Sequence, residues 1–346
     1  MRVLGWPAFS NRLNPHTALL YGAMEHLGVT VREFSRKRLI GARYDVWHLH
    51  WPERFLNNRR TLKALTATAG LLLTMDWARL RGTRLVWTVH NLHGHERAHE
   101  RLERYFWPRF VSRIDAFISL SDIGRDQALG AFPGLARKRS YVIPHGSYRD
   151  AYPDQISRAD ARATLGIEPG VGVFVSIGQL RRYKNLPHLV ATFRRLTGDY
   201  RLIIAGMGRD AELLGNLRAA AAGDPRILIR AEFVPDGELQ VYLRAADVMV
   251  LPYTDILNSG AAHLALSFDL PALVPHIGAL PALQHRAGPS WVRTYRGDLT
   301  SPELLAALAW ARDPSRPSHL ALDASDWATV GRQTVAAFEE ICGVPR

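Results

Sequence analysis

Short apolar runs alternate with longer amphipathic stretches along most of the chain. The runs are rich in β-branched, leucine and aromatic residues and end at Gly, Pro, Asp or His, which predicts buried strands. The predicted strands are 2–6, 46–50, 84–90, 116–120, 141–144, 171–177, 201–205, 227–229, 248–252 and 272–275. Helical periodicity between them predicts helices over 16–27, 62–80, 186–196, 210–222 and 237–245. Strands that are apolar throughout and alternate with helices indicate parallel sheets covered on both faces.

The strand–helix pattern starts again after residue 150, and 346 residues exceed what one hydrophobic core usually serves. A polar stretch rich in Pro and Gly, 150–172, separates the two series of strands. The fold class we expect is α/β, with two Rossmann-like domains whose parallel sheets face across a cleft. We place a first domain at 1–150, a second domain at 151–325, and a C-terminal helix at 326–346 that returns to the first domain.

The charge of the chain indicates an anionic partner. Lys and Arg outnumber Asp and Glu by 44 to 32, a formal net charge of +12. Nucleic acid, an acidic membrane surface and phosphorylated small molecules all fit such a charge. The segment 101–113 mixes arginines with aromatic residues, which suits either contact with membrane headgroups or a solvated helix face over an aromatic core.

No apolar run approaches the roughly 20 residues that a membrane-spanning helix needs. The N-terminus lacks the features of a secretory signal, and one cysteine, Cys342, excludes an internal disulfide and a cysteine-based zinc site. We therefore expect a cytoplasmic protein.

Ligands of open parallel sheets bind beyond the carboxyl ends of the strands, so the loops after each strand are the candidate sites. In the second half, SIGQLRRYKN follows a strand and supplies a glycine turn and three cations beside which an anion can bind. IIAGMG supplies a second glycine turn at the same edge. Asn258, Ser259 and Gly260 form a cap-like entry to a helix, whose free amides can hold a phosphate. Three such loops at one edge predict a phosphate-binding site.

The motifs VSIGQLRRYKN, LIIAGMG, FVPDGEL and AADVMVLPY occur in the order of the donor-binding half of GT-B glycosyltransferases, and most resemble family 4. TVHN, SLSD and VIPHG in the first half resemble the same group. The resemblance implies that Lys184, with Arg181 or Arg182, holds the donor diphosphate and that the backbone of 233–235 faces the base. The predicted donor-binding residues are Gly178, Gln179, Arg181, Arg182, Lys184, Phe233, Val234, Tyr253, Asp255, Asn258, Ser259 and Gly260.

The chain departs from family 4 at several positions. Gln179 stands in place of an arginine and Asn185 in place of a glycine. The paired glutamates, eight residues apart, are missing: Asp255 stands near the first, and the second falls on His263 or Leu264. That pair grips the donor sugar and ribose in retaining enzymes.

The segments VWHLHWPE and PYTDILNSGAAHLALSFDLP are more similar to the β-mannosyltransferases of xanthan-type exopolysaccharide assembly, family 94. This resemblance implies an inverting enzyme that moves mannose from GDP-mannose to a polyprenyl-diphosphate-linked oligosaccharide. It further implies peripheral association with the anionic inner face of the plasma membrane, no metal and no nucleic-acid partner.

An inverting transfer needs a base for the acceptor hydroxyl and positive charge on the leaving diphosphate. The base is expected from first-half loops that follow predicted strands. The candidates there are His16, His50, Glu53 and His90. Strand alternation puts His48 and His50 on one face, and we favour Glu53 or His16 as the base. Trp51, a stacking platform for a sugar ring, and Asn91 are the predicted acceptor-binding residues.

Alternative interpretations of the sequence remain. Histidines between 90 and 99, His95 among them, match no zinc motif and are accompanied by no D-x-D pair, so no metal site is expected. A retaining family-4-like transferase, a sugar-nucleotide epimerase using a UDP-sugar, and an inactive sugar-binding member share the fold. A non-catalytic nucleic-acid-binding protein would also explain the charge, but the arginines are dispersed and no nucleic-acid motif is present.

Overall fold

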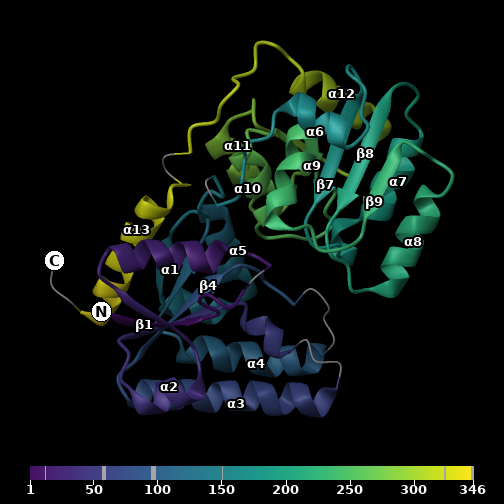
Figure 1. Ribbon diagram of the computed structural model, residues 1–346. Coiled ribbons are helices and arrows are strands. Elements are labelled where there is room, and N and C mark those ends of the chain that lie inside the picture. Colours follow the sequence, from purple (N-terminus) through teal and green to yellow (C-terminus); the bar gives the residue numbers. More distant parts are fainter. Residues whose placement is uncertain (12, 57–59, 95–98, 150, 323–324, 344–346) are drawn as a thin grey trace. The chain divides into compact units, whose positions relative to one another are not determined.

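A computed structural model describes the chain except for residues 12, 57–59, 95–98, 150, 323–324 and 344–346. The chain divides into two compact units, Met1–Gly146 with Asp323–Arg346, and Ser147–Leu322. Each unit is built on its own six-stranded parallel sheet with helices on both faces (Figure 1). The predicted α/β fold class, with two Rossmann-like parallel sheets, is confirmed.

The first unit has the strand order β2-β1-β3-β4-β5-β6. Its strands are β1 (Arg2–Trp6), β2 (Thr30–Glu33), β3 (Val46–His50), β4 (Arg84–Val89), β5 (Ala116–Ser119) and β6 (Arg139–Val142). Its helices are α1 (His16–His26), α2 (Arg36–Gly41), α3 (Thr61–Leu80), α4 (Glu100–Arg113), α5 (Asp122–Ala131) and α13 (Trp327–Cys342), with the short 3₁₀ turns η1 (Pro52–Phe55) and η2 (Pro133–Arg137). α13 packs beside α1 on one face of the sheet, and α3 and α4 lie on the other (Figure 1).

The second unit has the strand order β12-β11-β10-β7-β8-β9. Its strands are β7 (Gly172–Ile177), β8 (Tyr200–Ala205), β9 (Ile227–Arg230), β10 (Val248–Val250), β11 (Ala272–Pro275) and β12 (Val292–Tyr295). Its helices are α6 (Arg158–Thr164), α7 (Leu186–Arg194), α8 (Ala211–Ala221), α9 (Leu239–Ala245), α10 (Gly260–Ser267), α11 (Leu280–Ala287) and α12 (Ser301–Ala311), with the 3₁₀ turns η3 (Arg182–Lys184) and η4 (Asp236–Glu238).

The strand orders locate one crevice in each unit. In the first, the chain runs from β1 to β2 on one side and then to β3 on the other. In the second, it runs from β7 through β8 to β9 and then to β10 on the opposite side of β7. Loops on either side of such a reversal separate and leave room for a ligand beyond the strand ends. The loops after β1 and β3, and those after β7 and β10, are therefore the candidate site positions.

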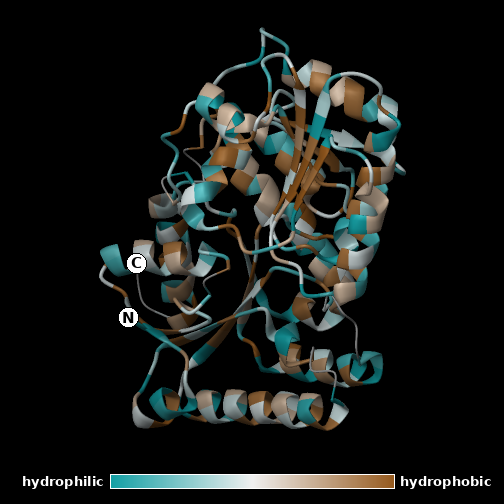
Figure 2. Ribbon diagram, turned by 45° about the vertical axis from the view of Figure 1, so that its right-hand side comes forward, coloured by the Kyte–Doolittle hydropathy of each residue, from teal (hydrophilic) through white to brown (hydrophobic). Residues whose placement is uncertain are grey.

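Two strands were not predicted, β2 and β12, and each lies at an edge of its sheet. An edge strand is covered less completely, so polar residues interrupt it: β2 reads TVRE and β12 reads VRTY. A search for continuously apolar runs overlooks them. The central strands are mostly hydrophobic, as their brown colour shows most clearly in the second unit (Figure 2). β6 was predicted two residues late, since it begins at the exposed Arg139.

A buried carboxylate ties helices to the sheet of the second unit. Asp247 is 5% exposed, accepts a hydrogen bond from the backbone N–H of Val173 at 2.7 Å, and forms ion pairs with Arg158, Arg162 and Arg312. Arg162 lies in α6, and Arg312 directly follows α12. The Asp247 side chain therefore ties both helices to β7. No helix among the described residues has the length and apolar character needed to span a membrane.

Candidate active site

Five histidines gather at the carboxyl edge of the first unit's sheet. His16 begins α1, His48 and His50 lie on β3, and His90 and His145 follow β4 and β6. All five are buried. The His16 ring centroid lies 4.4 Å from that of His145 and 5.2 Å from that of His90. The structure thus brings together the predicted residues His16, His50 and His90.

A chain of hydrogen bonds runs through this cluster. His48 Nε2 lies 2.7 Å from the Thr88 hydroxyl and its Nδ1 lies 2.9 Å from the Tyr21 hydroxyl. The same Tyr21 oxygen lies 3.0 Å from His50 Nε2, and His50 Nδ1 lies 2.8 Å from His90 Nε2. Tyr21 has one proton to donate, so its choice of partner sets the tautomer of both His48 and His50. Both nitrogens of His50 are engaged, which leaves it no lone pair for an acceptor hydroxyl.

Burial keeps His48, His50 and His90 neutral. It lowers the pKa of His48 to about 3, and it lowers the pKa values of His50 and His90 well below the usual range, with further lowering by neighbouring histidines. Neutral imidazoles can donate or accept single hydrogen bonds to a substrate hydroxyl, but these are weak bases.

Burial raises the pKa of Glu53, whereas it lowers those of the three neutral histidines. Trp51 adopts a left-handed conformation (φ 49°), which turns the chain from β3 into η1 and places Glu53 inside, where it is 4% exposed. Its Oε1 accepts a hydrogen bond from Asn91 Nδ2 at 2.9 Å. Burial raises the pKa of Glu53 to about 7 against the lowering effect of that hydrogen bond. A carboxyl group that titrates near neutrality is suited to general-base work.

Trp51, predicted as a platform for a sugar, already contacts protein groups. Its ring stacks on His90 at 4.3 Å and 20°, and the Arg54 guanidinium lies 5.1 Å from its centre. Asn91, the residue after His90, therefore links the histidine cluster to Glu53, while Trp51 packs on the cluster itself. Their part in binding an acceptor stays a prediction.

Three residues of this site were missed by sequence reasoning. His145 lies in a loop that the strand-end rule selects, but it was not among the predicted site residues. Tyr21 faces the cluster from α1, where its helical position alone carries no chemical signal. Trp327 comes from α13, and its ring centroid lies 5.3 Å from that of His16. Position 146 must be a glycine to leave room for this ring, since a Cβ there would lie 2.5 Å from Trp327.

In the second unit, the loops after β7 and β10 meet around a buried lysine. Lys184 is 5% exposed, donates to the Ile177 carbonyl at 3.3 Å and lies 5.9 Å from the centre of the Tyr253 ring. The Tyr253 hydroxyl is 3.0 Å from the Ser259 hydroxyl, which caps α10 through the Ala262 N–H at 3.1 Å. The structure therefore brings Lys184, Tyr253 and Ser259 together, with Gly260 as the first residue of α10.

Burial, with Arg181 nearby, lowers the pKa of Lys184 to about 8. No carboxylate lies within ion-pair distance of Lys184 among the described residues. Gly178 has a positive φ of 108°, and a Cβ there would lie 3.1 Å from the lysine Nζ. A glycine at this turn thus leaves space next to a desolvated cation, the property expected of an anion site.

The two arginines of the motif have separate roles. Arg182 is exposed and forms ion pairs with Asp210, at 2.6 Å, and Glu212. Arg181 donates to the Gln179 side chain at 3.0 Å and is the arginine whose charge acts on Lys184. The structure thus associates Arg181, and not Arg182, with the lysine.

The remaining predicted donor residues lie in two loops. Phe233 is half exposed, whereas Val234 is buried in the core and offers a ligand only its backbone. Asp255 is exposed in the loop after β10, where the neighbouring Thr254 N–H donates to the Tyr183 carbonyl at 2.8 Å. Asn258 lies in the same loop, just before Ser259. Their contact with a donor stays a prediction.

His95 lies outside the described residues. In the part of the chain that is described, no three His, Cys, Asp or Glu side chains are arranged to hold a metal ion.

Comparison with known proteins gives matches to both units. The model of the family Glycosyl transferases group 1 matches residues 157–267. Over 336 residues, the chain is 30% identical to the GDP-mannose:glycolipid 4-beta-D-mannosyltransferase of Xanthomonas campestris pv. campestris, covering 95% of this chain and 89% of that one.

Solved structures share the fold. Anabaena HepE in complex with UDP-glucose superposes with a TM-score of 0.72 at 15% identity, covering 98% of this chain and all of that one (100%). Sucrose-phosphate synthase from Thermosynechococcus elongatus superposes with a TM-score of 0.70 at 16% identity, with 99% of each chain covered. At such identities the likeness concerns the fold, which is GT-B.

Proposed function

Because this chain belongs to the glycosyltransferase family that includes the GDP-mannose:glycolipid 4-beta-D-mannosyltransferase of Xanthomonas campestris, we propose that it is an inverting mannosyltransferase. It transfers mannose from GDP-mannose to a polyprenyl-diphosphate-linked oligosaccharide in exopolysaccharide biosynthesis. The observation that carries the proposal is the extent of the similarity, which spans 95% of the chain and so includes both the unit with Lys184 and the unit with Glu53.

The second unit binds the donor and stabilises the leaving group. When the bond between mannose C1 and the diphosphate oxygen breaks, negative charge grows on that oxygen. Lys184 and Arg181, together with the amides at the start of α10, supply positive charge there without a metal ion. A desolvated ammonium that lacks a carboxylate partner gains more from a diphosphate than a solvated one does.

The first unit binds the acceptor and accepts its proton. The acceptor oxygen attacks C1 as GDP leaves, and the hydroxyl proton passes to the Glu53 carboxylate. Glu53 is a better base than His50 or His90, since burial lowers their pKa values, whereas the pKa of Glu53, about 7, lies near the working pH. His16 and His90 act as hydrogen-bond partners of acceptor hydroxyls.

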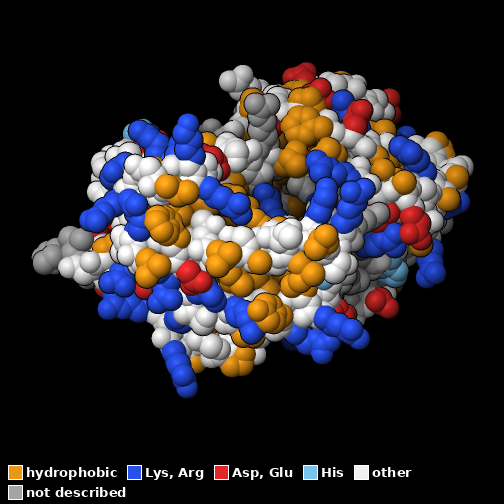
Figure 3. Space-filling model, turned by 90° about the horizontal axis from the view of Figure 1, so that it is seen from below, with side chains coloured by type: hydrophobic (Ala, Val, Ile, Leu, Met, Phe, Trp, Pro, Cys, Tyr) orange, Lys and Arg blue, Asp and Glu red, His pale blue; other side chains and the backbone are white. Residues whose placement is uncertain are grey.

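The acceptor's lipid requires work at an anionic membrane surface, the cytoplasmic face of the plasma membrane. Support comes from α3, which exposes Leu62, Leu73, Trp77 and Leu80 along one side, with Leu80 84% exposed. Hydrophobic and cationic side chains are interspersed on the face of the molecule shown in Figure 3. The pattern suits insertion among headgroups, with basic residues on anionic lipids.

The donor is tested by thermal unfolding with GDP, UDP and ADP. A ligand that binds only the folded protein stabilises it by about 2.7 kcal/mol at a concentration 100 times its Kd. GDP should raise the melting temperature most, Lys184→Ala should remove the shift, and the surface variant Lys63→Ala should keep it. A larger response to UDP would overturn the choice of GDP, and no response to any nucleotide would overturn the donor site.

The stereochemistry is tested on the product. Proton NMR of the purified product should show a β-linked mannose. An α-linked product would mean retention and would refute the single displacement that involves Glu53.

A further inference from the structure

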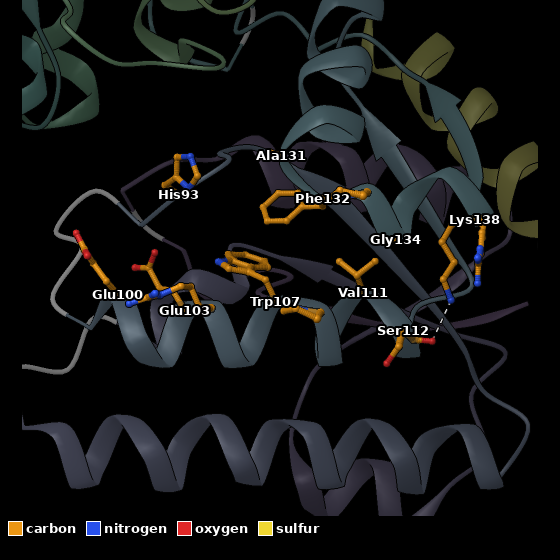
Figure 4. A pocket seen from close by; sticks show the side chains of 14 residues that line it. His93, Glu100, Glu103, Trp107, Val111, Ser112, Ala131, Phe132, Gly134 and Lys138 are labelled. Carbon is orange, nitrogen blue, oxygen red and sulfur yellow. Dashed lines mark hydrogen bonds between the residues drawn. The ribbon is translucent and has the colours of Figure 1, made fainter.

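One hollow of the first unit has no part in the chemistry proposed above. It is a groove of ≈ 850 Å³ between α4 and the turn from α5 into η2, and Figure 4 shows it from close by. Its volume falls within the roughly 300–1,000 Å³ of small-molecule sites. All of the residues that line it belong to the segments 93–112 and 131–138.

The lining changes character from one end to the other. His93, Glu100 and Glu103 lie at one end, and Ser112 and Lys138 lie at the other (Figure 4). Trp107, Val111 and Phe132 lie between the two ends, with Pro108, Ala131 and Pro133 also in the lining. The groove therefore has a polar end, where two carboxyl groups lie, an apolar middle and a basic end at Lys138. Arg137, the neighbour of Lys138 in the sequence, also lines the groove.

The apolar middle is preformed. Trp107 is 6% exposed, packs on Trp87 at 5.4 Å and lies 4.8 Å from the Phe132 ring. Phe106 and Phe110 hold it from within α4. A rigid floor of this kind needs little reordering when an apolar ligand covers it. Most of the free energy gained by burying the hydrocarbon of the ligand therefore contributes to the binding affinity.

We propose that this groove binds the first isoprenoid units of the lipid-linked acceptor. The inference rests on the proposed function, because that function supplies the lipid, and it specifies where the hydrocarbon lies. A flexible apolar chain matches the floor of Trp107, Val111 and Phe132, while the diphosphate and sugars stay at the polar end.

The polar end of the groove and the catalytic site share one loop of the chain. His93 lies in the loop after β4, which also carries His90 and Asn91, and Asn91 contacts Glu53 at 2.9 Å. An acceptor with its head at this end is directed along that loop toward Glu53. Arg104, which follows Glu103 in the sequence and also lines the groove, supplies a cation for the diphosphate.

The basic end suits the exit of the hydrocarbon into a membrane. Lys138 donates to the carbonyls of Ser112 and Ile114, at 2.9 and 2.7 Å, and neither it nor Arg137 has a carboxylate within ion-pair distance among the described residues. Two cations without acidic partners attract anionic headgroups beside the point where the chain leaves the groove.

The test is binding of farnesyl phosphate to the full-length protein saturated with GDP, which occupies the donor site. Ala131→Trp fills the groove from its exposed rim, and Ala136→Trp, on the neighbouring exposed turn, is the matched control. We expect Ala131→Trp to weaken farnesyl phosphate binding at least about tenfold, as loss of a few buried methylene groups does, and Ala136→Trp to leave it unchanged.

Three results would overturn the proposal: no binding of farnesyl phosphate, equal binding by Ala131→Trp, or equally tight binding of inorganic phosphate. The stabilisation by GDP should persist in Ala131→Trp. A protein that binds farnesyl phosphate in the groove but does not respond to GDP would refute the proposed function and leave the groove as an isoprenoid site.

Activity gives a second readout. With a polyprenyl-linked acceptor, Ala131→Trp should raise KM about tenfold, and with an acceptor bearing a short alkyl chain it should change neither KM nor kcat. An equal loss with both acceptors would mean that the substitution damages the site in general and that the chain does not lie in the groove.

Discussion

Replacing Glu53 by Gln should make the protein more stable and almost inactive at the same time. The substitution keeps the shape of the side chain and leaves an oxygen to accept the hydrogen bond from Asn91 Nδ2, now at 2.9 Å. It removes a charge that burial opposes, and it removes the proposed base. Both effects follow from one feature, the desolvation of a carboxyl group that is 4% exposed.

The size of the stability effect follows from the pKa of Glu53. Burial raises it from 4.5 to about 7 in the folded protein. Between these values the folded state keeps a proton that the unfolded state releases, so stability falls as pH rises, and above pH 7 the loss is constant. At 1.36 kcal/mol per unit, the carboxylate costs about 3 kcal/mol at pH 8 and about 1 kcal/mol at pH 5.

Urea unfolding of the wild type and Glu53→Gln at both pH values measures this difference. Tryptophan fluorescence reports mainly on the first unit, because only Trp291 and Trp310 lie in the second. Glu25→Gln, at an exposed carboxyl group on α1, is the control and should show no pH-dependent gain. If the advantage of Glu53→Gln over the wild type is the same at pH 5 and pH 8, the carboxyl group is not desolvated as argued.

The activity of the same variant tests the role of the carboxylate. Loss of a general base costs about 10²- to 10⁴-fold in rate. In the wild type, kcat/KM should rise with pH and level off above about 7, because only the deprotonated form accepts a proton. Glu53→Gln should lose this limb together with most of kcat while the stabilisation by GDP stays. A variant with wild-type turnover would exclude Glu53 as the base.

Three further predictions concern charges in the two units. Burial lowers the pKa values of His48, His50 and His90, so the stability they contribute is complete above pH 6.5 and is lost as the pH falls below it. The free energy of unfolding should decrease by up to about 4 kcal/mol per pH unit for three protons. Urea titrations at pH 6.5 and 5.5 measure this decrease, and equal stability at the two pH values would contradict burial of neutral imidazoles. A bound diphosphate should raise the pKa of Lys184 from about 8, so GDP affinity should fall as the pH rises above 8. Calorimetry near pH 8.5 in two buffers of different ionisation enthalpy should detect proton uptake on GDP binding that Lys184→Met lacks. Proton uptake that persists in Lys184→Met would assign the proton elsewhere. Asp247→Asn should cost about 3–5 kcal/mol in urea unfolding of the second unit, because three arginines lose their shared carboxylate, and a cost below about 1 kcal/mol would show that the ion pairs are dispensable.

The sequence alone determined most of the fold. Predominantly apolar runs bounded by turn residues located β1, β3 and β11 to the residue, because strands covered on both faces are mostly apolar. The same rule missed β2 and β12, which lie at the edges of the sheets and keep polar residues. The edge strands β6 and β9 were located, because their sequences still contain a short apolar or aromatic run, so partial burial leaves a weaker and less regular signal than complete burial.

The candidate site could be predicted as a set of loops but not as a network. The rule that ligands bind beyond strand ends selected His16, His50 and Glu53 in one unit and Lys184 in the other, since it depends only on strand direction. Which nitrogen of His50 bonds to which neighbour, and whether Arg181 or Arg182 accompanies Lys184, depends on contacts between segments far apart in the sequence.

The chemical character of each residue was decided by the tertiary structure. Glu53 and an exposed glutamate have the same side chain, and only the packing of η1 against the sheet removes water from one of them and raises its pKa to about 7. Trp327 reaches His16 because α13 packs beside α1, although the two residues are separated by most of the chain. A pattern along the chain specifies which residues avoid water, whereas the folded arrangement specifies what replaces the water around them.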